Sequence, residues 1–302
     1  MQQGTDRLPS SVIVRRRLMK NGIFQGLTAA VLSLTAAAAA TAQDSEDWDL
    51  LVQPENELTV AYTQFDNGLL LAARCQRGVY QVMIGGLPAA PESKDFHKSN
   101  RILVIGIGDE EEAEQRFLLG DNPSVAFSEL PAPLARQMRE GGTMTIAAPG
   151  GGEGGRNLRY LVELPASNAA IDQSLTACGR PLVDPRDQQL DELKDDGLPV
   201  NLAWKRAPQP EYPQGRTYTA GFAVVTCLSQ ADGRVDDCVV ETEFPVGGGF
   251  GAAAMRGTRK GRLENRGGGD GPIPARLIVY RVNYTMSDSE FSTGSRLRRG
   301  DE

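Results

Sequence analysis

The chain has 302 residues, of which 40% are hydrophobic, and a net charge of -7 at pH 7 from 39 Asp and Glu against 32 Lys and Arg. This acidic balance argues against general binding to nucleic acids or to anionic membranes, and a single histidine, His97, excludes a His-rich metal site. A low aromatic share of 6% with 34 Gly and 18 Pro favours short strands and many turns, so a mostly β chain is expected.

Residues 1–42 are predicted to be a secretory signal peptide. A basic cluster, Arg15–Lys20, precedes an Ala- and Leu-rich stretch that closes on Ala40 and Ala42, as at an A-x-A cleavage site. The alternative is an uncleaved anchor, because residues 23–42 are about long enough to span a bilayer. We expect cleavage, since the stretch is Ala-rich and ends on small residues. The product would then lie in the periplasm rather than anchored in the inner membrane and facing the periplasm.

Four cysteines in an exported chain are expected to form two disulfides, whereas a reducing compartment would leave free thiols. The Asp-Gly pair at 232–233 is typical of a hairpin turn. Opposed residues of a hairpin have position numbers with a constant sum, which places Cys227 opposite Cys238. Opposed Cα atoms lie about 4.5 to 5.5 Å apart, within the span of a disulfide. Elimination then pairs Cys75 with Cys178.

Residues 43–181 are predicted to form a β-rich periplasmic domain, sandwich-like or else a rolled sheet. Its expected strands, from alternating or continuous apolar runs between turn residues, are 57–63, 67–75, 78–84, 101–107, 143–149 and 157–164. Two helices are expected at 131–142, with Pro early and Gly at the end, and at 167–179, with Ser167 as the N-cap. The bridge to Cys178 would fasten the second helix to the sheet.

Residues 182–207 are predicted to be an acidic, Pro-containing linker between two domains. The stretch 182–198 holds six Asp and Glu against one Arg and one Lys, which indicates a solvated linker or a short exposed helix. The Pro-rich stretch 207–215 favours an extended chain, because each Pro biases the residue before it away from helix. The polar end of the chain, 291–302, is predicted to be disordered.

No motif points to catalysis, to a cofactor or to a metal. The Gly-rich runs at 149–155 and 267–271 lack the Lys-Ser or Lys-Thr pair of a phosphate-binding loop. His97 lies in a charged segment, with no acid and nucleophile that the sequence selects for it. Residues 110–112, three glutamates, lack the alternating ligands of a calcium loop and are expected in a solvated loop or helix start. We therefore assign no catalytic, cofactor or metal residue and do not predict an enzyme.

The C-terminal segment shows an ordered series of features: Tyr212-Pro213, the Asp-Gly turn, a Gly-rich start of a helix near Phe250, a Gly-x-Pro step at 271–274 and a closing apolar strand. In this order and spacing, residues 208–286 resemble the C-terminal domain of the TonB energy-transducer family. The resemblance implies a small antiparallel sheet with helices on one face at 208–290, and so an α+β chain. The hairpin bridge would fasten a sheet too small to rely on its core.

Two departures from the family put proton-driven energy transduction in doubt. Full transducers keep an uncleaved inner-membrane anchor that carries a histidine, and they cross the periplasm on a long Pro-rich spacer. Here His97 lies far from the apolar segment, and a strand-rich domain takes the place of the spacer.

We therefore expect an exported envelope protein with a TonB-like protein-binding module. If the strand order follows the family, the closing strand is an edge, and an unpaired edge accepts an extended peptide by strand addition. The expected partner is a segment of an envelope protein, such as an outer-membrane transporter. The arginines at 276 and 281 would either bias it toward acidic sequences or act only as solvated edge charges that prevent aggregation. The predicted partner-binding edge residues are Arg276, Ile278, Tyr280, Val282 and Tyr284.

Two other functions remain open. One is a genuine membrane-anchored energy transducer for outer-membrane transport, which would contact the membrane through a retained signal segment. The other is a periplasmic enzyme with an unrecognised site in the N-terminal domain, which a deep polar cleft with convergent carboxylates would favour.

Overall fold

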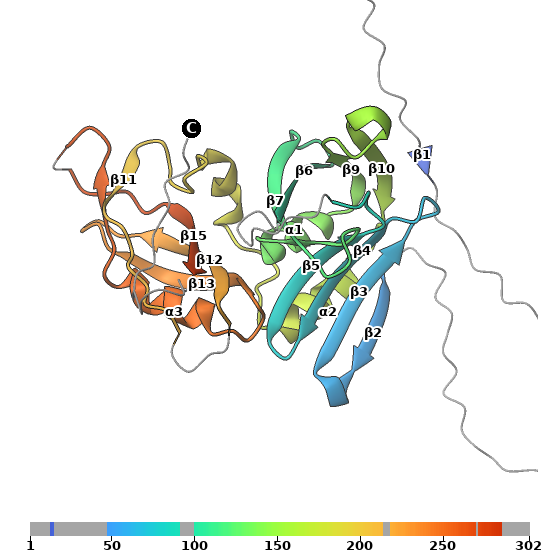
Figure 1. Cartoon of the computed structure of the whole chain (residues 1–302), viewed down its shortest axis with the longest axis horizontal. Helices are drawn as coiled ribbons and strands as arrows, with labels where there is room; N and C mark the ends of the chain where they lie inside the picture. The colour runs from blue at the N-terminus through green and yellow to red at the C-terminus, as the bar shows by residue number, and fades with distance from the viewer. Residues whose placement is uncertain (1–12, 15–46, 91–99, 214–217, 270, 286–302) are drawn as a thin grey trace, which may run out of the picture.

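A computed structural model describes residues 13–14, 47–90, 100–213, 218–269 and 271–285. The predicted cleavage site, His97 and the predicted disordered tail lie outside the described residues. Figure 1 shows two lobes, an N-terminal one drawn in blue to green and a C-terminal one in orange to red, with a yellow connecting segment between them. The fold is α+β, and nearly all of its strand pairs are antiparallel.

The N-terminal lobe contains a ten-stranded sheet of order β1-β10-β9-β6-β7-β8-β5-β4-β3-β2. The strands are β1 (Ile13–Val14), β2 (Asp49–Gln53), β3 (Leu58–Gln64), β4 (Leu70–Gln76), β5 (Val79–Gly85), β6 (Asn100–Ile107), β7 (Ala113–Leu119), β8 (Ala126–Ser128), β9 (Gly142–Ala148) and β10 (Leu158–Leu164). The helices are α1 (Pro131–Met138) and α2 (Ala169–Ala177), with single 3-10 turns at Pro54–Asn56 and Glu153–Gly155.

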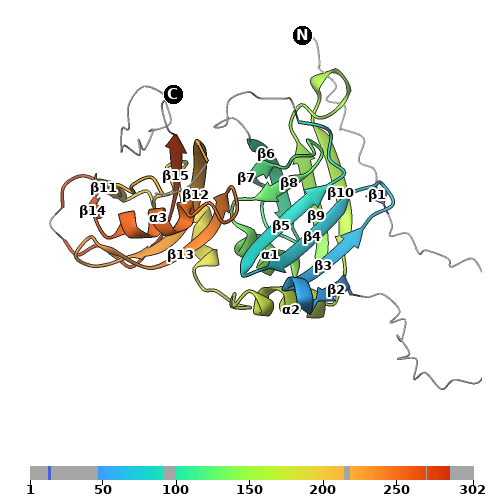
Figure 2. The ribbon, with the colours of Figure 1, turned by 60° about the horizontal axis from the view of Figure 1, so that its bottom comes forward.

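Of the two layouts expected for this lobe, the sandwich is wrong, because the strands form one continuous sheet. Strand β8 pairs with both β7 and β5, so it joins two halves that a sandwich would keep as separate layers. Inward side chains from both halves, together with residues of α1 and α2, form one hydrophobic core. Because both halves bury side chains in the same core, the sheet curls around it, as Figure 2 shows.

All six strands predicted for this lobe are present, as β3, β4, β5, β6, β9 and β10. The sequence missed β1, β2, β7 and β8; β1, which pairs with β10, lies within residues 1–42, the stretch predicted to be a signal peptide. Strand β7 begins with charged and exposed residues, and β8 is three residues long, so neither shows a clear alternation. The glutamates at 110–112 lie in the turn that leads into β7, which is the solvated loop expected for them.

Both predicted helices are present, and a disulfide ties the end of α2 to the sheet. The N-cap of α2 is Asn168, without a side-chain cap; the hydroxyl of Ser167 instead accepts a long bond, 3.4 Å, from the amide of Ala169. Cys178, at the end of α2, is bonded to buried Cys75 of β4, with Cα atoms 5.4 Å apart. This is the pairing expected by elimination, and it fastens the last element of the lobe to its core.

The C-terminal lobe has a three-stranded sheet of order β13-β12-β15 and a two-stranded sheet of β11 and β14. Its elements are β11 (Leu202–Arg206), β12 (Ala220–Ser229), β13 (Val235–Phe244), α3 (Phe250–Thr258), β14 (Arg262–Asn265) and β15 (Leu277–Thr285). Helix α3 packs against β12 and β13, and Phe250 is fully buried there. The helix start near Phe250 and the closing strand were both expected from the sequence.

The predicted linker is more structured than expected. Residues Asp187–Glu192 form a 3-10 helix (η4) with no buried residue, which is the short exposed helix considered above. Residues Leu202–Arg206 form β11, which pairs with β14, and Leu198 and Leu202 are buried in the core of the C-terminal lobe. Leu198 is the last residue of the acidic stretch 182–198, and Leu202 lies within the range predicted to be a linker, so neither leucine was expected in the core.

The hairpin of β12 and β13 places Cys227 opposite Cys238 by two compensating features. The amide of Gln230 bonds to the carbonyl of Arg234 at 2.8 Å, so the loop has three residues and ends on Gly233 at φ +79°. Asp237, at φ +48°, lies where the register shifts by one residue. The bulge therefore restores the pairing that a two-residue turn would give, and the cysteines are bonded with Cα atoms 4.1 Å apart.

Candidate binding cleft between the lobes

Strand β15 is an edge of its sheet, but the predicted partner-binding residues do not face that edge. The side chains of Ile278, Tyr280, Val282 and Tyr284 are all buried in the core of the lobe. The amide of Val279 points away from β12, toward Gly197. Because main-chain directions alternate along a strand, the main chains of these four residues point the other way, toward β12. Arg276 precedes the strand, and its carbonyl accepts from the amide of Ser229 at 2.9 Å.

The first half of the outer edge of β15 is already bonded to the connecting segment. The amide of Leu277 donates to Gln189 Oε1 and the amide of Val279 donates to the carbonyl of Gly197, both at 2.9 Å. A Cβ on Gly197 would lie 1.7 Å from the carbonyl oxygen of Val279, so only glycine allows this approach. The outward amides that remain in β15 belong to Arg281, Asn283 and Thr285.

Two arginines donate hydrogen bonds to the opposite edge of the sheet, which is strand β13. Arg180 Nη2 donates to the carbonyl of Val240 at 2.7 Å, and Arg186 Nη1 donates to that of Asp237 at 3.2 Å. Arg180 also lies 3.7 Å from Glu241. Burial raises the pKa of Glu241, and the charge of Arg180 partly offsets this rise. Both edges of the C-terminal sheet thus bind groups from outside the sheet.

Arg281 is engaged between the lobes. Its guanidinium lies over the ring of Phe222, 4.0 Å from the centroid, and forms an ion pair with Glu129 of the N-terminal lobe. Both side chains of the pair are largely buried, and burial raises the pKa of Glu129 against the opposing effect of Arg281. The side chain of this arginine, which the sequence suggested as a contact for an acidic peptide or as a solvated edge charge, is therefore engaged in the contact between the lobes.

The space beside this contact is a cleft of about 820 Å³ between the lobes. Apolar side chains from both lobes and from the connecting segment contribute to its lining, among them Ile102, Leu130, Leu190, Val224 and Val279. Carboxylates outnumber cations in the lining by eight to three, so the cleft favours a positively charged ligand. The carboxylates are Glu110, Glu111, Glu112, Glu114, Glu129, Asp191, Asp195 and Asp196, and the cations are Arg116, Lys194 and Arg281.

A stretch of β7 has an open edge in this cleft. On one side, β7 pairs with β6 from Ala113 to Leu118. On the other side, pairing with β8 begins at Phe117, and the carbonyl of Arg116 accepts from the amide of Glu129 at 3.2 Å. Main-chain directions alternate along a strand, so the main chain of Glu114 points to the same side as that of Arg116, which is the side of β8. Strand β8 does not extend as far as Glu114, so this side is open there. Among the described residues, nothing hydrogen-bonds to it there.

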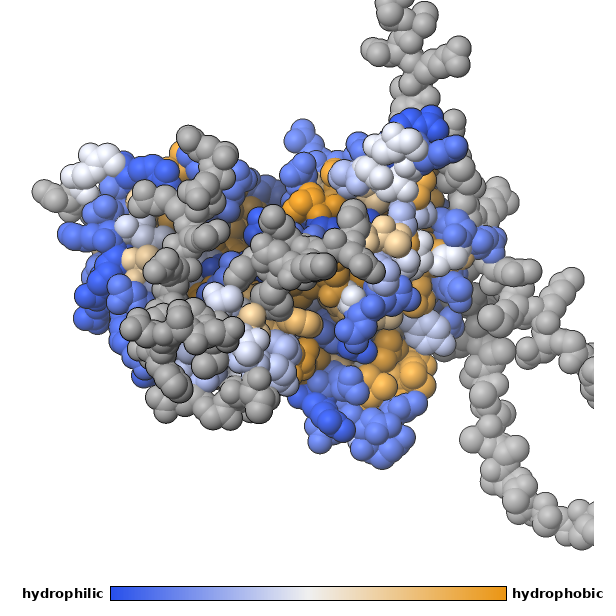
Figure 3. All heavy atoms as spheres, viewed as in Figure 1, coloured by the Kyte–Doolittle hydropathy of each residue, from blue (hydrophilic) through white to orange (hydrophobic). Residues whose placement is uncertain are grey.

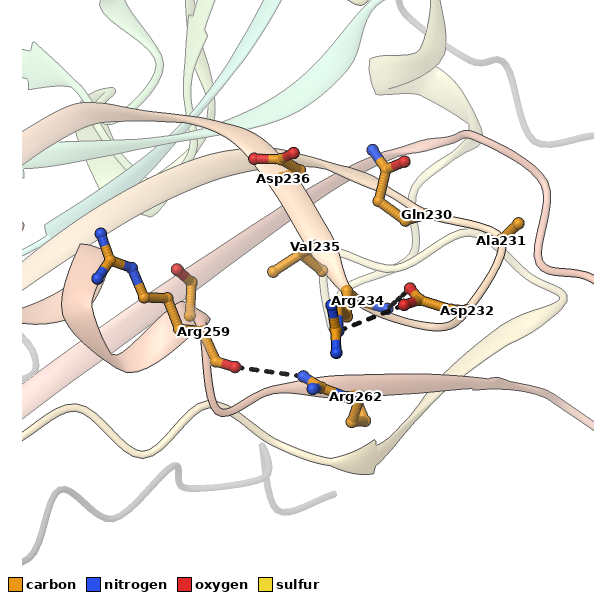
Figure 4. Close-up of a pocket in the computed structure, with 9 residues that line it drawn as sticks. Gln230, Ala231, Asp232, Arg234, Val235, Asp236, Arg259 and Arg262 are labelled. Carbon is orange, nitrogen blue, oxygen red and sulfur yellow. Dashed lines mark hydrogen bonds and ion pairs between the residues drawn. The ribbon is translucent and has the colours of Figure 1, made fainter.

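A second pocket, of about 690 Å³, lies at the tip of the hairpin (Figure 4). Its arginines serve local structure: Arg234 pairs with Asp232 at 3.3 Å, and Arg262 donates to the carbonyls of Arg259 at 3.2 Å and Gly261 at 2.5 Å. The latter bonds satisfy carbonyls at the end of α3. The pocket is therefore a helix end and a hairpin turn rather than a ligand site.

Within the described ranges, no group of three or more His, Cys, Asp and Glu side chains is arranged to hold a metal ion. In that part of the chain, too, no helix is long and apolar enough to cross a bilayer. The two disulfides are consistent with an exported protein.

Comparisons with models of protein families, with curated proteins and with solved structures find no match to the chain. The resemblance of residues 208–286 to the TonB family therefore stays a prediction from their sequence features.

Proposed function

We propose that the chain is an exported envelope protein that binds an extended, basic segment of a partner protein in the cleft between its lobes. The observation that carries this proposal is the open edge of β7, whose Glu114 main chain faces a cleft that is apolar inside and acidic at its rim. An extended segment can add a strand there, with main-chain bonds for affinity and side-chain contacts for specificity.

The proposal keeps strand addition, which the TonB resemblance implies, but moves the acceptor edge. Residues 189–197 already bond to the first half of β15, so a partner at that strand would first have to displace them. The edge at Glu114 requires no such displacement. The excess of carboxylates in the cleft reverses the charge preference expected from Arg276 and Arg281 and selects basic segments.

The test uses the whole chain and a blocked peptide of alternating Lys and Val as the probe, with a Glu and Val peptide of equal length as the control. We expect the basic peptide to shift the amide resonances of Glu114 and Arg116, and the acidic peptide to leave them unchanged. Glu114→Pro should abolish binding, because it removes an outward amide that β6 does not use. Glu114→Gln keeps the amide and should weaken binding only through the lost charge.

Two results would contradict the proposal. One is that neither peptide shifts the resonances of β7, and the other is that the acidic peptide binds as tightly as the basic one. Peptide-induced shifts confined to Arg281 and Asn283 would instead assign the function to β15, as the family resemblance implies.

A second candidate, a hydrolase, is favoured by one observation in the same cleft. The pKa of Glu110 is raised, first by partial burial and then by the charges of Asp191 and Glu140. A carboxyl group whose pKa is raised beside another carboxylate is a feature that general acid catalysis uses. It stands second because Glu110 and Asp191 are exposed, whereas such catalysis uses a water-excluding site.

The hydrolase would be supported if the wild type cleaved fluorogenic glycosides or peptides and Glu110→Gln did not. The third possibility, an anchored energy transducer, depends on residues 23–42, which lie outside the described residues. A mature chain that begins at Gln43 would count against it.

A further inference from the structure

Strand β2 combines an edge position with an exposed apolar surface. Three consecutive residues, Leu50, Leu51 and Val52, are 40%, 41% and 48% exposed. Because successive side chains point to opposite faces, both faces of the strand are open. Figures 1 and 2 show β2 as the outermost strand beside β3, and Figure 3 shows an apolar patch over it. An exposed apolar edge is a template for pairing with a further strand.

The hydrogen-bond directions of β2 follow from its neighbours. The amide of Arg77 donates to the carbonyl of Glu57, which lies opposite it across β3 and β4. Because main-chain directions alternate, the main chains of the even-numbered residues of β3 point toward β2. These residues are Leu58, Val60 and Tyr62, which face Gln53, Leu51 and Asp49 in that order. The main chains of Leu50 and Val52 therefore point away from the sheet, into the open edge.

The sequence of β2 is complementary to itself in the antiparallel direction. With a two-fold axis at Leu51, Leu50 of one copy faces Val52 of the other, and these are the residues whose main chains point outward. The same register sets Asp49 against Gln53, so no like charges face each other. A register shifted by one residue would oppose an outward main chain to an inward one and could form no ladder.

We propose that β2 pairs with β2 of a second copy of this chain, antiparallel about Leu51, to give a symmetric dimer with one continuous sheet. Leu50 and Val52 of both copies form an apolar cluster on the core side of the sheet, and the two Leu51 side chains meet on the other side. A five-residue strand buries less surface than a standard interface, so the dimer is reversible and depends on concentration.

A register-specific cross-link tests the pairing. In the proposed dimer Leu51 faces itself in a pair without direct hydrogen bonds, where Cα atoms lie about 4.5 Å apart, within the span of a disulfide. Leu51→Cys should therefore give a linked dimer under mild oxidation. Leu50→Cys is the matched control: its two copies lie about 8 Å apart, beyond the span of a disulfide, since each faces Val52. It should stay unlinked.

Sedimentation of the purified whole chain gives the second measurement. The weight-average mass of the wild type should rise with concentration toward twice that of one chain. Leu51→Lys sets two like charges face to face and should abolish this rise. Val183→Lys, at a residue that is 75% exposed outside β2, should leave the rise unchanged.

Any of three outcomes would overturn the dimer. These are a wild-type mass of one chain at every concentration, association that survives Leu51→Lys, and equal cross-linking of the two cysteine variants. A monomeric wild type would assign the exposed edge to a strand of a different protein.

Discussion

Gly197→Ala tests whether the connecting segment holds the edge of β15. Gly197 has φ +72°, and its added Cβ would overlap the carbonyl of Val279, so the segment must move and its hydrogen bond to the Val279 amide must break. The left-handed conformation costs a non-glycine residue about 1 to 2 kcal/mol, and the lost bond adds about 1 kcal/mol. We therefore expect the free energy of unfolding to fall by about 2 to 3 kcal/mol.

Gly247→Ala is the matched control, because Gly247 has the same φ of +72° and nothing within 4 Å of its added Cβ. It should lose only the conformational part, about 1 to 2 kcal/mol. Urea unfolding gives both losses, and hydrogen exchange of the Val279 amide shows whether its bond survives. Equal losses in the two variants, together with unchanged protection of Val279, would refute the contact and with it the covered edge of β15.

Three further predictions concern the bridges, the hairpin and the contact between the lobes. Replacing both Cys75 and Cys178 with Ser should lower the free energy of unfolding by about 5 kcal/mol, and replacing both Cys227 and Cys238 by about 3 kcal/mol, because the bridges span 103 and 11 residues and the larger loop restrains more chain entropy. Urea unfolding that ranked the two variants the other way would contradict this account. Gly233→Val should lower stability by about 1 kcal/mol or more, and by more than the control Gly268→Val. Both positions have positive φ, but only a Cβ at 233 would meet a backbone oxygen, that of Leu263 at 2.5 Å. Equal melting temperatures would mean that the close approach of Gly233 to Leu263 is unimportant. Because the pKa of Glu129 is raised in the folded state, its contribution to stability is fully present below the ordinary value of 4.5 and is lost as pH rises through the raised pKa. The wild type should therefore lose stability relative to Glu129→Gln as pH rises from 4.5. A stability difference that is independent of pH would contradict the direction of this pKa shift.

Local signals predicted much of the fold. Apolar alternation identified six strands of the N-terminal lobe, and the Asp-Gly pair located a hairpin whose register the bulge at Asp237 then restored. Strand β11 was missed because Leu202 lies between the acidic stretch 182–198 and the Pro-rich stretch 207–215, whose overall composition indicated a linker. A composition averaged over a window cannot show that two leucines in it reach a core formed by distant strands.

The state of the sheet edges could not be predicted from the sequence. The bonds that close them join residues far apart in the chain, such as Arg180 with Val240 and Gly197 with Val279. The open edge at Glu114 also depends on the short length of β8, which leaves the start of β7 unpaired on one side. The family resemblance suggests strand addition as a mode of binding to test, whereas the choice of the β7 edge as the proposed acceptor depends on the cleft that both lobes line.

The connectivity of the disulfides has a consequence for the biogenesis of the chain. The cysteines are bonded in the order of the sequence, the first to the second (Cys75 to Cys178) and the third to the fourth (Cys227 to Cys238). If the chain enters an oxidising compartment N-terminus first, Cys178 is the first partner that Cys75 meets, and the N-terminal lobe can close before Cys227 arrives. Simple oxidation in order of arrival thus yields the native bridges, and maturation needs no enzyme that reshuffles disulfides.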